Sequence, residues 1–205
     1  MKALDFSKEY ILENDNVRLA PLHLDHVKNL LKISNDPDIW TYLLEKGNEY
    51  KQLLTYVSKA VDNRKIEKEY PFIVYDKTKK AYAGTTRFYN YSKELGVIKL
   101  GHTWYGKDFR GTQLNKNCKY LLLEFTFDNL ELERIGFGAH IENETSIAAM
   151  KSIGCKEEGI LRSFIPSLNG EGRVDIILFS ILKNEWQAFV KSKLSQKLKS
   201  KSIEL

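Results

Sequence analysis

A six-residue segment in the middle of the chain has the composition of a phosphate-binding turn. It reads Arg110-Gly111-Thr112-Gln113-Leu114-Asn115 and lies between a β-rich stretch and a long helical pattern. A turn that opens a helix presents unpaired main-chain N–H groups and the positive end of the helix dipole, which together attract a phosphate. Arg110 would add a bidentate contact. Each dipole interaction contributes only about 0.3–1 kcal/mol, so the amides and the arginine must act together, and a plain helix start remains the alternative.

Metal and disulfide chemistry find no support in the sequence. Cys118 and Cys155 have no CxxC spacing, and we interpret them as buried structural thiols. The histidines are scattered and form no HExxH-type pair, at His23, His26, His102 and His140. We therefore predict neither a metal site nor a disulfide.

The charge balance favours an anionic partner. The net charge is +5 and the pI is near 9.0, which suits coenzyme A or a nucleic acid. Many lysines fall near the C-terminus, however, where a solvated helix end or tail is the simpler interpretation: Lys191, Lys193, Lys197, Lys199 and Lys201. The charge alone would also allow a nucleic-acid-binding protein, but no helix-turn-helix, zinc-finger or RNA-recognition signature supports that function.

Neither a membrane nor export is expected. The sequence has no run of about 18 apolar residues, and its first seven residues, MKALDFS, lack the apolar centre of a signal peptide. We therefore expect a cytoplasmic protein, monomeric or homodimeric.

The elements that would position the turn form one α/β unit. With 205 residues, 42% of them hydrophobic, the chain can bury one substantial core, and we predict a single domain at 1–185 followed by a C-terminal helix and basic tail at 186–205. Apolar spacing predicts two helical regions before the sheet, one ending near Asp36-Pro37 and one running from Trp40 to Val61 with a turn at Gly47-Asn48. Strands are predicted at 16–21, 72–75, 81–91, 97–105, 134–141, 155–164 and 173–182, with a hairpin turn at 169–172. Further helices are predicted at 114–129, at 146–153 and around Trp186.

This order of elements resembles the acetyl-CoA-binding core of the GNAT superfamily. The segments GHTWY at 101–105, FRGT at 109–112, ENETS at 142–146 and KSIG at 151–154 are similar to the RimJ/RimL branch, which contains ribosomal-protein alanine N-acetyltransferases. The resemblance runs from Val17 to Leu182. It implies a mixed, mostly antiparallel sheet that is splayed between two parallel core strands and has helices on both faces. It also implies transfer of an acetyl group from acetyl-CoA to a primary amine.

The resemblance assigns roles position by position. Residues 110–115 would cradle the pyrophosphate, and the main chain of Thr103, Trp104 and Tyr105 would meet the pantetheine arm and the thioester. Asn143 would bond to the pantetheine arm while Ser146 caps the next helix, although turn and cap chemistry explain both equally well. The acceptor would lie against Trp40, Tyr42, Arg87 and Tyr89, although aromatic residues in such places more often belong to the core.

Two departures from the family pattern concern the coenzyme. The family loop is usually Q/R-x-x-G-x-G/A, and Gln113 and Asn115 stand here at its two later small-residue positions. Many members also carry a tyrosine four residues before the glycine that ends the last core helix, where it protonates the departing thiolate. Met150 stands at that position, so no general acid is assigned.

The expected chemistry is direct attack of a neutral amine on the thioester. Holding two reactants in line can supply about 7–11 kcal/mol of the barrier, so a strong base is not required. His102 is the leading candidate for a base and Glu142 the second, with a packed strand residue as the alternative for His102. A GNAT-fold module that binds coenzyme A without catalysis is the alternative function, suggested by Gln113, Asn115 and Met150.

Overall fold

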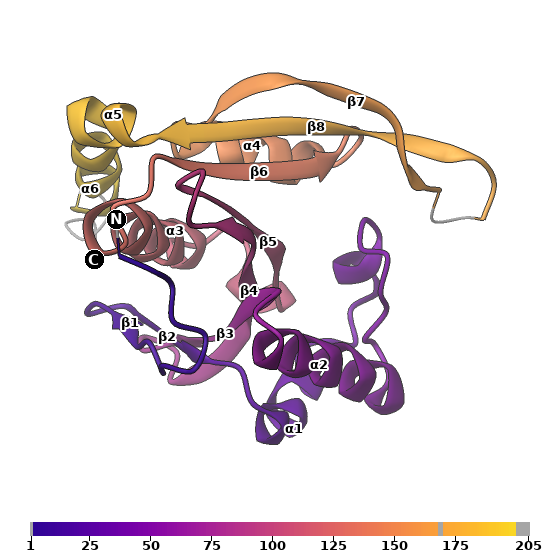
Figure 1. Ribbon diagram of the computed structural model, residues 1–205. Helices are drawn as coiled ribbons and strands as arrows, with labels where there is room; N and C mark the ends of the chain where they lie inside the picture. Colours follow the sequence, from indigo (N-terminus) through magenta and orange to yellow (C-terminus); the bar gives the residue numbers. More distant parts are fainter. Residues whose placement is uncertain (1, 168–169, 200–205) are drawn as a thin grey trace.

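The computed structural model describes residues 2–167 and 170–199. A two-stranded start, two helices and a hairpin lead into the central part of the chain (Figure 1). The elements are β1 Leu12–Glu13, β2 Val17–Pro21, α1 Val27–Leu31, α2 Tyr50–Lys65, β3 Glu69–Asp76, β4 Ala81–Ser92, β5 Val97–Tyr105, α3 Leu114–Glu124, β6 Arg134–His140, α4 Glu144–Ser152, β7 Lys156–Pro166, β8 Arg173–Leu182, α5 Lys183–Glu185 and α6 Lys191–Lys199. No helix within these described ranges is both long enough and apolar enough to cross a bilayer.

One mixed sheet carries the fold. Its strand order is β1-β2-β3-β4-β5-β6-β8-β7, and every neighbouring pair is antiparallel except β5 and β6, which run parallel. The parallel ladder is short, because it joins only Val97–Lys99 to Arg134–Gly136. Beyond Lys99 and Gly136 the two strands separate, so the predicted splayed, mostly antiparallel sheet is confirmed.

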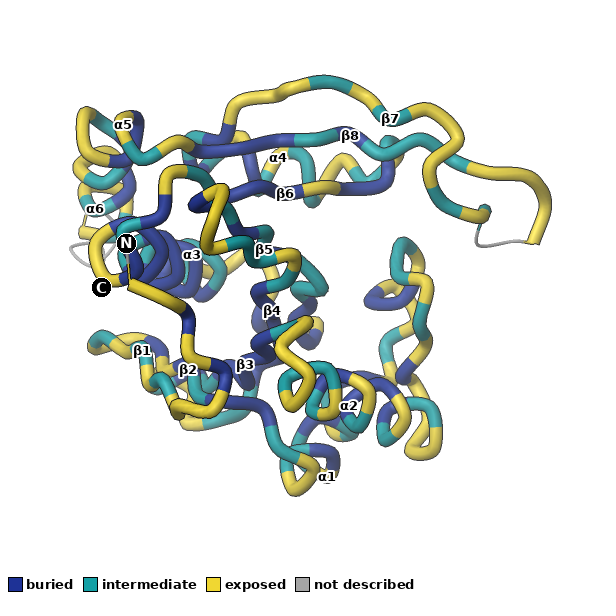
Figure 2. The backbone as a smooth tube through the Cα atoms, viewed as in Figure 1, coloured by how far each residue is buried: buried dark blue, intermediate teal, exposed yellow. Residues whose placement is uncertain are grey.

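Helices cover both faces of this sheet, as the strand alternation requires. Ile73 and Trp104 face the smaller core cluster under α1 and α2. Phe72 and Tyr105 face the larger cluster under α3 and α4. Figure 2 shows that burial is concentrated where β3 to β6 cross the molecule, whereas the outer part of the β7–β8 hairpin is largely exposed.

The helix predicted from Trp40 is wrong at its start. Residues Pro37–Trp40 form one 3₁₀ turn, in which the Asp36 side chain accepts from the Asp38 N–H, and α2 begins only at Tyr50. Trp40 is instead fixed by its indole, which donates to the Ser34 carbonyl at 2.9 Å. Its ring packs so closely on Gly47 that a Cβ there would come within 2.3 Å. Tertiary packing therefore decides the path of this segment.

The C-terminal helix is built into the same core. Trp186, Val190 and Leu194, which lie in the segment predicted as a C-terminal helix and basic tail, are buried in the larger cluster. Lys191 pairs with two carboxylates that follow one another along α3 and the π-helical turn after it, Glu124 and Asp128. Asn169 of the predicted hairpin turn and Lys201 of the basic tail lie outside the described residues.

Candidate active site

The start of α3 presents a set of free amides. The main-chain N–H groups of Gly111, Gln113, Asn115 and Lys116 have no hydrogen-bond acceptor among the described residues. Gly111 has a φ of +71°, a conformation that other residues rarely adopt, and no atom lies within 4 Å of where its Cβ would be. An open array of this kind at a helix N-terminus is an anion-binding site.

The side chains of Gln113 and Asn115 are directed to protein partners. Gln113 keeps helical dihedral angles, φ −75° and ψ −6°, and its Nε2 donates to the Lys197 carbonyl at 3.2 Å, which ties the loop to α6. Asn115 Oδ1 accepts from the Tyr105 hydroxyl at 3.3 Å. These two departures from the family loop therefore leave its amides available.

Arg110 anchors the loop in the structure. Its Nε donates to the Tyr105 carbonyl at 3.0 Å, and its Nη2 lies 3.0 Å from Asp36 Oδ2. The guanidinium thus links the end of β5 to the segment before the 3₁₀ turn. A role for Arg110 on the pyrophosphate would require it to exchange Asp36 for the phosphate.

A bulge interrupts β5 where it leaves β6. Thr85 pairs with Trp104 and Arg87 with Gly101, so both His102 and Thr103 stand opposite the single residue Thr86. His102 accordingly has a φ of +48°. Beyond Lys99, no strand in the described part of the chain pairs with the edge of β5 that faces β6. A free edge can bind an extended ligand that carries amide groups, as an added strand would.

The loop before α4 corrects one assignment. Asn143, and not Ser146, caps this helix, because its side chain accepts from the Ser146 N–H at 3.0 Å. Glu142 beside it is exposed, and its carbonyl accepts from the Tyr42 hydroxyl at 3.2 Å. The Tyr42 ring also lies 5.0 Å from that of His140. The structure thus brings Tyr42 and Glu142 together at the end of β6.

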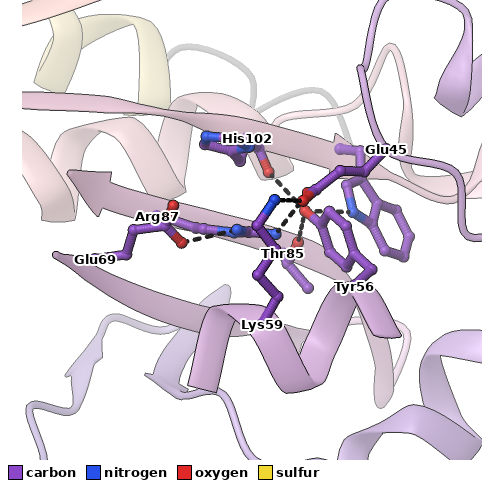
Figure 3. A network of polar contacts seen from close by, with 8 residues as sticks. Glu45, Tyr56, Lys59, Glu69, Thr85, Arg87 and His102 are labelled. Carbon is purple, nitrogen blue, oxygen red and sulfur yellow. Dashed lines mark hydrogen bonds and ion pairs between the residues drawn. The ribbon is translucent and has the colours of Figure 1, made fainter. Parts of the chain in front are cut away.

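A buried charged network lies on the α2 side of β5 (Figure 3). The Arg87 side chain is fully buried; its Nη1 lies 2.8 Å from Glu69 Oε2 and its Nη2 3.9 Å from Glu45 Oε2. Its guanidinium also stacks 4.3 Å from the centre of the Tyr56 ring. Sequence reasoning missed Glu45, Tyr56 and Glu69, because they come from three separate elements and share no motif.

The network sets the charge state of His102. Burial and the nearby Arg87 guanidinium lower the pKa of His102 from 6.5 to about 4. The imidazole is therefore neutral at pH 7 and can accept a proton, but it is a weak base. The Tyr89 ring lies 5.5 Å away and packs on it edge to face.

Two residues predicted on the acceptor side are part of the core. Trp40 is only 1% exposed and packs against Tyr56 and Trp104. Arg87 is 0% exposed and is held by its carboxylate partners. Trp40 and Arg87 therefore lie behind the surface of the site. Tyr42 and Tyr89 are the two residues of the predicted set that are partly exposed.

Lys119 is a further residue that sequence reasoning missed. It lies on α3 yet is only 7% exposed, and its Nζ donates to Thr103 Oγ1 at 3.1 Å. Burial lowers the pKa of Lys119 from 10.5 to about 8. Its helical phase was the available signal, since it precedes the buried Leu122 and Leu123 by three and four residues.

The comparisons with known proteins agree with this geometry. A family model described as an acetyltransferase (GNAT) domain matches residues 16–156. The chain belongs to this family. Within the residues that the structure describes, no group of three or more His, Cys, Asp or Glu side chains is placed to hold a metal ion.

Three GNAT relatives illustrate the range of similarity. "Putative ribosomal N-acetyltransferase YdaF" of Bacillus subtilis (strain 168) is 34% identical over 104 residues, so the match spans about half of each protein, 51% of this chain and 55% of YdaF. The crystal structure of a GCN5-related N-acetyltransferase from Brucella melitensis has a TM-score of 0.86 at 26% identity, covering 95% of this chain and 87% of that one. Mycobacterium smegmatis RimJ in complex with CoA-disulfide has a TM-score of 0.76 at 18% identity, covering 92% and 93%, and this supports the fold alone.

Proposed function

We propose that this GNAT protein transfers the acetyl group of acetyl-CoA to a primary amine by direct attack within a ternary complex. The observation that carries the proposal is that the open edge of β5 leads to the free amides at the start of α3. The parallel ladder with β6 ends at Lys99, and free amides follow at the start of α3. A ligand with its pyrophosphate on those amides can extend its pantetheine arm along the open edge of β5. Acetyl-CoA has this shape and this order of groups.

The chemistry rests mainly on placement. A thioester held between the separated strands meets an amine from the α2 side, and a main-chain N–H of the bulged strand stabilises the developing oxyanion. His102 is the proposed proton acceptor because it is neutral and adjoins the bulge. Glu142 is the second candidate, at the mouth of the site.

A protein or peptide N-terminus is the first acceptor that we propose, and a small amine is the second. The name of the Bacillus subtilis relative, "Putative ribosomal N-acetyltransferase YdaF", supports an acceptor on a ribosomal protein. The Tyr42 loop, which reaches the end of β6, would form one wall of a groove for an extended peptide.

The alternative is a GNAT module that binds coenzyme A without turnover. Isothermal calorimetry with acetyl-CoA, followed by a thiol-release assay against a library of N-terminal peptides and small amines, separates the two. We expect micromolar or tighter binding and release of CoA with some acceptors. Binding without thiol release from any acceptor would favour the non-catalytic module, and no binding at all would overturn both.

A further inference from the structure

Lys119 is a buried cation, and none of the described residues provides it with a counterion. Its Nζ donates to Thr103 Oγ1, and Thr103 in turn bonds to Thr86 Oγ1 at 2.7 Å. Two of the three ammonium protons therefore have no acceptor among the described residues. Taking an ammonium out of water without a partner of opposite charge destabilises the folded state.

The charged and titratable groups around Lys119 give it no negative partner. The groups that bear on its ammonium are the thiols of Cys118 on the same helix and of Cys155 after α4. Burial raises the pKa of each thiol to about 12, so both are uncharged at neutral pH. The centre of the Phe137 ring lies 5.9 Å from Nζ, and this side chain is neutral as well.

The position of the ammonium matches the separation of the core strands. Thr103 lies in the bulge of β5, and Phe137 is the first residue of β6 beyond the parallel ladder. Lys119 follows Leu114 by five residues, so its Cα lies about 7.5 Å along the helix axis from the start of α3. The ammonium therefore lies near a residue of each strand where the two strands part.

We propose that Lys119 protonates the sulfur of coenzyme A as it departs from the acetyl group. This inference rests on the proposed acetyl transfer. The amine nitrogen forms a bond to the carbonyl carbon, and the tetrahedral intermediate then collapses with cleavage of the C–S bond, whose electron pair goes to sulfur. One N–H proton of Lys119 passes to that sulfur and gives the thiol. His102 takes the proton released by the acceptor amine and passes it to solvent, and the neutral Lys119 amine regains a proton from solvent.

Met150 stands where many family members carry the tyrosine that protonates the departing thiolate, so that position supplies no proton donor here. It is buried on α4 in the larger core cluster, and a thioether has no proton to donate. The pKa of Lys119, lowered to about 8, suits a donor that must release its proton near neutral pH. Burial of the ammonium thus supplies both the location and the acidity that the departing thiolate requires.

The test is the ionisation of coenzyme A bound to the protein. The ultraviolet absorbance of the thiolate is followed against pH for wild type, Lys119→Met and the matched control Lys93→Met, each corrected by the same protein without coenzyme. The protein's own thiols ionise only near pH 12 and do not interfere. We expect the thiol acid constant of bound CoA to be at least tenfold larger in wild type and in Lys93→Met than in Lys119→Met. Lys119→Gln, which keeps a donor for Thr103, should behave as Lys119→Met does.

The outcomes separate this inference from the proposed function. If all variants bind CoA and its thiol ionises equally in each, Lys119 does not face the sulfur and the inference is overturned, while coenzyme binding stands. If wild type does not bind CoA, the proposed function itself is overturned. With an acceptor identified, loss of Lys119 should slow acetyl transfer about 10²–10⁴-fold. The slowing should shrink with acetyl-selenoCoA, whose more acidic leaving group needs no proton donor.

Discussion

Replacing Lys119 with methionine should make the protein more stable. The pKa of Lys119 falls from 10.5 to about 8 because its side chain is buried. At 1.36 kcal/mol per pKa unit, that lowering means that the buried ammonium costs the folded state about 3 kcal/mol at pH 7. Methionine has a similar length, carries no charge and fits among the apolar neighbours, so the variant should avoid most of this cost.

The pH dependence of the stability difference between wild type and Lys119→Met shows whether the buried ammonium causes it. Below pH 8 Lys119 is protonated in both states, and the full cost applies. Between pH 8 and 10.5 the unfolded chain binds more protons at this residue than the folded chain does, so the stability of wild type rises with pH relative to the variant. Urea unfolding at intervals from pH 6.5 to 10.5 should therefore show a difference of about 3 kcal/mol that narrows across the upper half of this range.

Lys93→Met provides the baseline for this measurement. Lys93 lies in the exposed turn between β4 and β5, where a substitution should change the free energy of unfolding by less than about 0.5 kcal/mol. If Lys119→Met is less stable than wild type at pH 7, the ammonium has a compensating partner and the reasoning is refuted. A stability difference that does not change with pH would refute it equally.

Three further predictions concern the proposed coenzyme and amine sites. Arg110→Ala should weaken acetyl-CoA binding in calorimetry and leave the fold intact. If Arg110 moves to the phosphate, Asp36→Asn should not weaken that binding. An equal loss of acetyl-CoA affinity in the two variants would show that Arg110 only anchors the loop. If His102 is the base, kcat/KM calculated on the concentration of neutral acceptor amine should fall with acid only near pH 4, the pKa of His102. His102→Ala should reduce turnover more than acetyl-CoA affinity, and an unchanged rate and pH profile would remove His102 from the mechanism. Gln113→Gly should change acetyl-CoA affinity by less than tenfold, about 1.4 kcal/mol, because Gln113 contacts the Lys197 carbonyl on α6 and does not cover the amides; a large gain in binding would show that it blocks the site.

The sequence was sufficient for the sheet and its long helices because their signals are local. The strand at Val97–Tyr105 and the helix from Leu114 follow directly from side-chain alternation and helical spacing. The structure of the segment around Trp40 could not be predicted from local signals. Its aromatic residues read as a helix, but Trp40 is held by Ser34, Gly47 and rings from other elements, and no local pattern encodes those contacts.

The candidate site likewise has one part with a local sequence signal and another that depends on long-range contacts. The phosphate loop is contiguous, so its glycine and helix start could be found from spacing alone. The Arg87 network draws Glu45 and Glu69 from distant parts of the chain, and only the folded sheet brings them together. Lys119 shares the helical phase of the buried Leu122 and Leu123, but that phase alone does not establish burial of a lysine, which depends on how α3 sits across β5 and β6.

Two features that cost stability meet at Thr103. His102, the residue before it, has a φ of +48° in the middle of a strand, and such a conformation costs roughly 1–3 kcal/mol in a residue other than glycine. Asn90 and Ser163, the other described strand residues with positive φ that are not glycine, are exposed, whereas His102 is half-buried. On the other side, Thr103 accepts the one hydrogen bond that the Lys119 ammonium makes with a described residue. Strain and unpaired charge that persist together in a folded protein are typical of a functional site, and here both lie where β5 parts from β6. In the proposed reaction, the bulge would turn main-chain N–H groups toward the thioester carbonyl, and the ammonium would meet the negative charge that develops on sulfur. The stability lost at these two positions therefore supports our proposal that the acyl-transfer centre lies where the core strands separate.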